Sequence, residues 1–175
     1  MPVNLSQLSD VKWVQPHAFS RSFELQAGGD VVATLEFRKM FGSLAVGRTS
    51  DGAWTLKRRG YFNTTVSVRV EGSEQDIAIY EPNWAGTKGA VVLSNGERLP
   101  FQTTNFWGTE RVLTDATGEA LVRFHNKGVF HHGAEVEVTT AGAKRENIGM
   151  LLILCWYVLV LYMEDSSAAT VVMAG

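Results

Sequence analysis

A basic segment contains the residues of this 175-residue chain that are best suited to ligand chemistry. Residues 38–70 carry seven basic side chains and one acidic one, Asp51, a local charge of +6 on a chain whose net charge is −2. Lysine and arginine donate charge-assisted hydrogen bonds to phosphate and carboxylate groups. The segment therefore predicts a site for an anionic ligand; the alternative is a solvated sheet face whose charges prevent association between edges. The residues predicted to form this site are Lys39, Arg48, Lys57, Arg58 and Arg59.

A predicted hairpin determines how these basic residues would be arranged. If Ser50-Asp51-Gly52 is its turn, Arg48 lies near Trp54 and stacks on its ring. The same register gathers three basic residues at the other end of the hairpin: Lys39, Arg58 and Arg59.

The other reactive side chains predict neither a metal site nor a nucleophile. Metal ligands must converge on one point, but His131 and His132 are adjacent and face opposite ways in a strand. A metal-dependent barrel enzyme, which would also draw on His125, is retained as an alternative function. Cys155, the only cysteine, lies within an apolar run and is expected to be a buried, inert thiol.

Known catalytic loops are also missing from the sequence. No Gly-rich phosphate loop and no serine nucleophile elbow is present, so we predict a non-catalytic protein without a cofactor. Three aromatic residues lie near predicted turns, where they would form a binding rim or cap the end of a barrel: Trp84, Phe106 and Trp107.

The elements that must position these residues follow a strand pattern. Apolar and polar residues alternate along stretches such as 33–37, 66–70 and 120–124, with turn residues about every ten positions, and Asn95-Gly96 is a strong hairpin signal. This pattern predicts about eleven or twelve strands in an all-β antiparallel barrel or sandwich. We place the lead-in at residues 1–20 and a single domain at residues 21–165.

An apolar run near the end of the sequence completes this prediction. Residues 149–163 are apolar at every helical position, and a helix that is apolar all round must be surrounded on all sides. A closed sheet of about twelve strands encloses more space than its own side chains fill. We therefore predict a hydrophobic α-helix at about residues 147–163 inside the barrel, followed by a tail at 166–175. The alternative is a tail-anchored membrane protein with residues 148–163 as the span.

Composition predicts the setting of the protein. The first ten residues lack the pattern of a secretory signal, and a single cysteine is typical of a reducing compartment. We expect a cytoplasmic protein, peripheral to a membrane if its ligand is a lipid, and the net charge gives no pull toward nucleic acid.

Three stretches resemble the tubby-like superfamily: Trp54-Thr-Leu-Lys-Arg-Arg-Gly60, Gly118-Glu-Ala-Leu-Val122 and the apolar helix at Leu151–Leu161. Over residues 20–165 the pattern is most similar to small LURP-one-related and phospholipid scramblase-like members. The resemblance implies a twelve-stranded barrel threaded by a hydrophobic helix, with basic side chains on the barrel surface that bind phosphoinositide headgroups. The calcium-associated acidic segment of scramblases is matched here only by Glu164-Asp165.

The function expected from these observations is a non-catalytic tubby-like binding or scaffolding module. Its expected partners are anionic phospholipid headgroups at a membrane surface or another protein.

Overall fold

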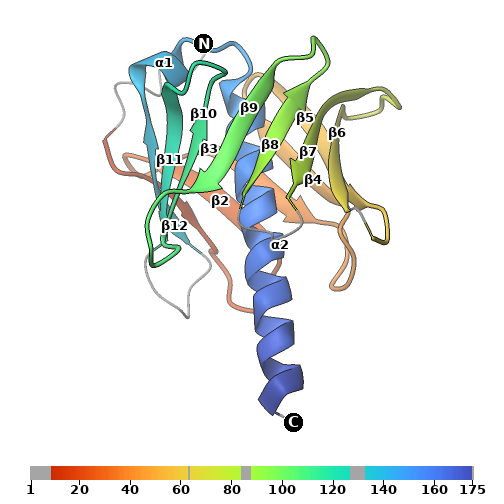
Figure 1. The fold of residues 1–175 in the computed structure, drawn as a ribbon. Coiled ribbons are helices and arrows are strands. Elements are labelled where there is room, and N and C mark those ends of the chain that lie inside the picture. The colour runs from red at the N-terminus through yellow and green to blue at the C-terminus, as the bar shows by residue number, and fades with distance from the viewer. Residues whose placement is uncertain (1–8, 63, 84–87, 127–132, 175) are drawn as a thin grey trace.

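The chain folds into a closed antiparallel barrel around a central helix (Figure 1). The computed structural model describes residues 9–62, 64–83, 88–126 and 133–174, which form twelve strands and two helices. The strands are β1 (Val11–Val14), β2 (Ser22–Ala27), β3 (Asp30–Phe37), β4 (Ala45–Thr49), β5 (Gly52–Arg59), β6 (Thr65–Val70), β7 (Asp76–Pro82), β8 (Lys88–Leu93), β9 (Arg98–Thr103), β10 (Glu110–Thr114), β11 (Ala120–Asn126) and β12 (Ala134–Val138). The helices are α1 (Thr140–Ala143) and α2 (Ile148–Ala174). Each strand pairs with its sequence neighbours and β1 pairs with β12, which confirms the predicted barrel.

The apolar run fills the interior of this barrel. Every residue from Met150 to Leu161 is buried, so the helix that is apolar on all sides is surrounded on all sides by inward-facing strand residues. By its length and composition alone, α2 could cross a membrane. However, 72% of its apolar 18-residue stretch is buried inside the barrel. Most residues of the alternative membrane span therefore belong to the core, whereas Tyr162 near its end is exposed.

Both predicted boundaries of the domain need correction. The predicted lead-in contains β1, which closes the barrel, and Trp13 of this strand stacks on Trp156 of α2 with ring centroids 5.6 Å apart. The predicted tail is helical, because α2 continues to Ala174. Glu164 and Asp165 lie within the helix, where it leaves the barrel, and each forms an ion pair with an arginine of the barrel.

The register of the β4–β5 hairpin differs from the prediction by one residue. Thr49 pairs with Gly52, which leaves Ser50 and Asp51 as a two-residue turn and places Arg48 opposite Ala53. A shift of one residue moves a side chain to the other face of a sheet. Arg48 therefore does not lie over Trp54, whose ring packs against the core.

The helix lies against one side of the barrel. Its closest backbone approaches are to β3, β4 and β5, and Gly47 of β4 packs directly against the Ile153 side chain. The α1 end of the barrel, where α2 begins, carries α1; at the opposite exit end, α2 leaves the barrel and projects beyond it (Figure 1).

Candidate binding site at the exit end of the barrel

The structure does not bring the five predicted basic residues into one cluster. Lys57 and Arg59 lie on the outer face of β5 and are exposed or half-buried, whereas Arg58 between them lies on the inner face. Lys39 is exposed in the β3–β4 connection at the exit end. Alternation of side chains along β5 is the physical reason for this separation.

Arg48 already has a partner on the outer face of the barrel. Its guanidinium donates a hydrogen bond to Glu71 at 2.8 Å, and Arg38 lies 3.6 Å from the same carboxylate. The acidic stretch that follows the basic segment therefore neutralises part of the +6 charge.

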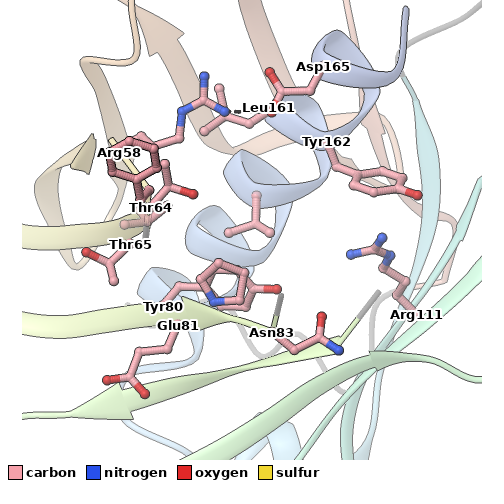
Figure 2. Close-up of a pocket in the computed structure, with 14 residues that line it drawn as sticks. Arg58, Thr64, Thr65, Tyr80, Glu81, Asn83, Arg111, Leu161, Tyr162 and Asp165 are labelled. Carbon is pink, nitrogen blue, oxygen red and sulfur yellow. Dashed lines mark hydrogen bonds and ion pairs between the residues drawn. The ribbon is translucent and has the colours of Figure 1, made fainter. Parts of the chain in front are cut away.

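A cavity of about 500 Å³ opens at the exit end, between α2 and strands of the barrel (Figure 2). We call it the exit cavity. Side chains of β5, β6, β7 and β10 and the loop after β5 line it, together with the last buried turns of α2. Its apolar walls are Phe62, Val66, Tyr80, Val158 and Leu161, and its polar side chains include Thr64, Thr65, Asn83, Arg58 and Arg111.

Arg111 is the unusual residue of the exit cavity. It lies on the inner face of β10 and is only 5% exposed. Its guanidinium lies 4.5 Å above the ring centroid of Tyr162 and 6.0 Å from that of Phe101. Among the residues that the structure describes, no hydrogen bond or ion pair reaches Arg111, so its charge is balanced by aromatic faces alone.

The other charges around the exit cavity are paired. Arg58 donates a hydrogen bond to Asp165 at 2.7 Å, and Glu81 accepts one from Arg98 at 2.9 Å. Arg21 holds Glu164 with two hydrogen bonds, of 2.7 and 2.9 Å, and also donates to carbonyls of the β3–β4 connection. These ion pairs tie the emerging helix to the rim of the barrel.

Tyr80 contributes a neutral donor beside Arg111. Burial raises the pKa of Tyr80 to about 12, and the neighbouring Arg111 charge opposes that shift. At neutral pH the phenol is therefore protonated. Gly89 makes room for it, since a Cβ there would collide with the Tyr80 hydroxyl.

Exposed aromatic side chains surround the same end of the barrel. We call this set the aromatic rim; its described members are Phe19, Phe41, Tyr61, Phe62, Phe106 and Trp107. They lie on four connections that all face the exit end: β1–β2, β3–β4, β5–β6 and β9–β10. Phe106 is 94% exposed and Trp107 is 81% exposed, so these rings cap no part of the core.

The projecting turns of α2 are uncharged and weakly apolar. Residues 166–174 are all exposed, with Val171, Val172 and Met173 near the tip. The hydroxyls of Ser166, Ser167 and Thr170 donate to carbonyls one turn earlier in the helix. The polar side chains of this segment thus have their hydrogen bonds satisfied within the helix.

The remaining candidate residues form no site in the described part of the chain. Cys155 is buried as predicted, and burial raises the pKa of its thiol, which keeps it unreactive. The described residues contain no group of three or more His, Cys, Asp or Glu side chains able to hold a metal ion. The predictions for His131, His132 and Trp84 fall outside the described residues.

Sequence reasoning missed Arg111, although a signal was present. In β10 the arginine occupies the same strand face as Leu113, so a basic residue stands at an inward position of an alternating pattern. The sequence places Phe106 and Trp107 near a predicted turn. The structure adds that both rings are exposed and that they lie at the exit end.

Comparisons with protein-family models, with curated proteins and with solved structures find no match to this chain.

Proposed function

We propose that the protein is a non-catalytic binding module that docks on anionic membrane surfaces through its exit end. The observation that carries this proposal is the gathering of exposed aromatic side chains on the loops of one end only. Among the described large apolar residues that are exposed, only Val31 and Val70 lie at the α1 end. Aromatic rings at the boundary of a membrane place an apolar body and a polar edge in their preferred surroundings.

Charge at the same end favours an anionic surface. Lys39, Arg59 and Lys88 are exposed at or beside the exit end and have no ion pair among the described residues. Each basic residue close to an anionic membrane contributes about 1 kcal/mol of attraction. Two members of the predicted cluster, Lys39 and Arg59, therefore keep a role in the proposal, although they do not form a pocket with Arg58.

The projecting turns of α2 add to this argument. At 1.5 Å per residue, residues 166–174 rise about 14 Å, which is about half of the hydrocarbon thickness of a bilayer. These turns carry no charge, and their hydroxyls are bonded within the helix. We infer that they enter the membrane while the barrel stays at its surface.

The tubby-like resemblance supports the same proposal, since it implies a barrel that binds anionic lipid headgroups. A cytoplasmic location with peripheral attachment to a membrane follows as part of the proposal. A protein partner at the aromatic rim is the competing outcome that the experiment must separate.

Vesicle co-sedimentation tests the proposal. The full chain is mixed with phosphatidylcholine vesicles, with and without phosphatidylserine, and we expect it to sediment with the anionic vesicles. Replacing Phe106 and Trp107 by Ser should reduce binding by at least about tenfold, because each buried aromatic ring contributes about 1.5–3 kcal/mol. The matched control is Val31→Ser with Val70→Ser at the α1 end, which should bind as the wild type does.

Two outcomes would contradict membrane docking. One is failure of the folded wild type to sediment with anionic vesicles, which would leave a protein partner as the occupant of the rim. The other is an equal loss of binding in the rim variant and in the α1-end control.

A further inference from the structure

We propose that the exit cavity binds an amphiphile with an oxyanion head, a phosphate or a carboxylate, and that Arg111 is the residue that holds this head. The proposal rests on the cavity and its charges, whereas membrane docking rests on the exposed aromatic rim. Either proposal can therefore fail while the other stands.

The first step concerns the cost of the Arg111 charge. A guanidinium removed from water is unfavourable unless an opposite charge or hydrogen-bond acceptors replace the solvent. Arg111 is 5% exposed, but its guanidinium borders the exit cavity and none of its nitrogens is among the fully buried polar atoms without a partner. Apart from water in the cavity, the face of Tyr162 at 4.5 Å is its nearest described stabilising contact. An oxyanion in the cavity would supply the missing acceptors.

The second step concerns the nearby carboxylates. Asp165 lies in the cavity wall but accepts from Arg58 at 2.7 Å, and Glu81 accepts from Arg98 at 2.9 Å. Because both acids are paired, one positive charge in the wall remains unbalanced, that of Arg111. A cavity built to hold a neutral or cationic molecule would not leave a buried guanidinium in this state.

The third step concerns the hydrogen-bond donors in the cavity wall. The cavity wall also carries the side chains of Thr64, Thr65, Asn83 and Tyr80, all able to donate hydrogen bonds. Figure 2 shows Arg58 and Arg111 on opposite sides of the cavity, with α2 behind them. Thr64 and Thr65 lie on the side of Arg58, whereas Tyr80 is close enough to Arg111 for the two groups to interact electrostatically. A planar guanidinium in a cavity that also holds neutral donors suits the several acceptor sites of a phosphate or carboxylate.

The fourth step concerns the body of the ligand. A volume of about 500 Å³ lies within the range of sites for small organic molecules and exceeds the need of a bare ion. Apolar side chains from β6, β7 and α2 form much of the wall, among them Val66, Tyr80 and Val158. We therefore assign the remaining space to an apolar chain or ring joined to the oxyanion.

Isothermal titration in buffer without vesicles tests this proposal. The probes are decyl phosphate, decanoate, decanol and inorganic phosphate, each offered as monomers in solution. We expect wild type to bind decyl phosphate or decanoate more tightly than decanol, which lacks the charge, and more tightly than inorganic phosphate, which lacks the apolar body. Arg111→Met should weaken binding of the charged amphiphile roughly 10- to 100-fold, the range for a lost hydrogen bond to a charged group.

The matched control is Arg123→Met. Arg123 lies on the neighbouring strand β11, outside the cavity, and pairs with Glu137 at 3.1 Å, so its removal should leave titration unchanged. Arg111→Lys retains the charge without the planar fork and should bind with intermediate strength.

Thermal unfolding separates a binding role of Arg111 from a structural one. If the role of Arg111 is to bind a ligand, Arg111→Met should melt at the same temperature as wild type or higher. The substitution removes an unpaired charge of low exposure and keeps a side chain of similar length. Decyl phosphate should raise the melting temperature of wild type but not of this variant.

Three results would overturn the proposal: equal binding of decyl phosphate by wild type and Arg111→Met, binding of decanol as tight as that of the charged amphiphiles, or binding of inorganic phosphate as tight as that of decyl phosphate.

Discussion

At the α1 end of the barrel the strand connections are polar turns, whereas at the exit end the described connections carry six exposed aromatic side chains. The polar side chains of the α1-end turns bond to their own backbone: Asp115 accepts from the N–H groups of Thr117 and Glu119, and Asn95 accepts from that of Glu97. Arg145 closes this end by a two-bond pair with Glu97, of 3.0 and 2.5 Å.

The exit end leaves comparable groups without such partners. Arg111 has no acceptor in the described part of the chain, and the rings of Phe106 and Trp107 have no apolar neighbour in the core. Polar loop side chains bond to their own backbone at the exit end too, since Asn105 accepts from the N–H groups of Thr109 and Glu110. The two ends therefore differ in the unpaired Arg111 and in the exposed aromatic rings of the exit end. This difference between the two ends is the basis for our proposal that the exit end contacts a molecule outside the chain.

The largest expected effect comes from the residue that sets the position of the helix. Gly47→Ala should destabilise the fold by about 1–3 kcal/mol, because the added Cβ would collide with the Ile153 side chain in a packed core. Urea denaturation measures this change. The cost should shrink in an Ile153→Ala background, since that change removes the colliding group; an equal cost in both backgrounds would show that Gly47 does not position α2.

The same substitution at the two ends should have opposite effects. Arg145→Met should cost about 1–2 kcal/mol, since both partners of its ion pair are largely buried and Glu97 would lose its counter-ion. Arg111→Met should cost nothing or stabilise the fold, because it has no partner to lose. Chemical denaturation of both variants in the same buffer measures the two changes in the free energy of unfolding. A loss of stability in both variants would contradict the expected difference between the two ends.

Alkaline pH should weaken the exit half of the core. Burial raises the pKa of Tyr157 to about 12, although the Ser43 side chain opposes the shift, and burial likewise raises the pKa of Tyr80 from 10.0 to about 12. The folded state therefore keeps these protons when the unfolded chain loses them, so stability is full below pH 10 and falls as the pH rises toward 12.

Tyr157→Phe tests this pH dependence. The variant should lose about 1 kcal/mol at neutral pH, where the hydrogen bond to the Ser43 carbonyl is missing, and should lose less than wild type between pH 10 and 12. Urea denaturation across this range measures both effects. The exposed Tyr61→Phe is the control and should follow wild type; identical alkaline curves for all three proteins would refute the assignment.

The smallest expected effect is on the stability of the rim variant. Phe106→Ser with Trp107→Ser should change the free energy of unfolding by less than about 0.5 kcal/mol, because both rings are exposed. Thermal melts alongside the vesicle assay measure it. A large loss of stability would mean that the rings support the fold and were not left free for a partner.

The sequence predicted the architecture because the strand pattern and the apolar run are local properties. Alternation at stretches such as 33–37 and 66–70 gave the barrel, and the apolar run at 149–163 gave the buried helix. The helix continues past the predicted end at about residue 163 to Ala174, and Glu164 and Asp165 pair within it with Arg21 and Arg58, which are far away in sequence. β1 was missed because a four-residue strand carries little periodic pattern.

The candidate site depended on features that a linear reading does not contain. The β4–β5 pairing is shifted by one residue from the predicted register, so Arg48 and Trp54 lie on opposite faces of the sheet. Because side chains alternate along β5, Arg58 faces inward while Lys57 and Arg59 face outward. The exit cavity forms between α2 and strands β5, β6, β7 and β10, which are far from α2 in the sequence. The count of charges along the sequence identifies the basic segment at residues 38–70, but Arg111, the arginine without a described partner, lies outside that segment.

The position of α2 in the chain has a consequence for how the protein is made. A ribosome delivers all twelve strands before the segment that occupies the centre of the sheet, and β1 must wait for β12 to close the ring. Until then the inner faces of the strands display apolar side chains with nothing to cover them. Folding through such distant contacts is slow and competes with aggregation. We therefore expect the nascent chain to depend on chaperones until residues 148–161 have left the ribosomal tunnel.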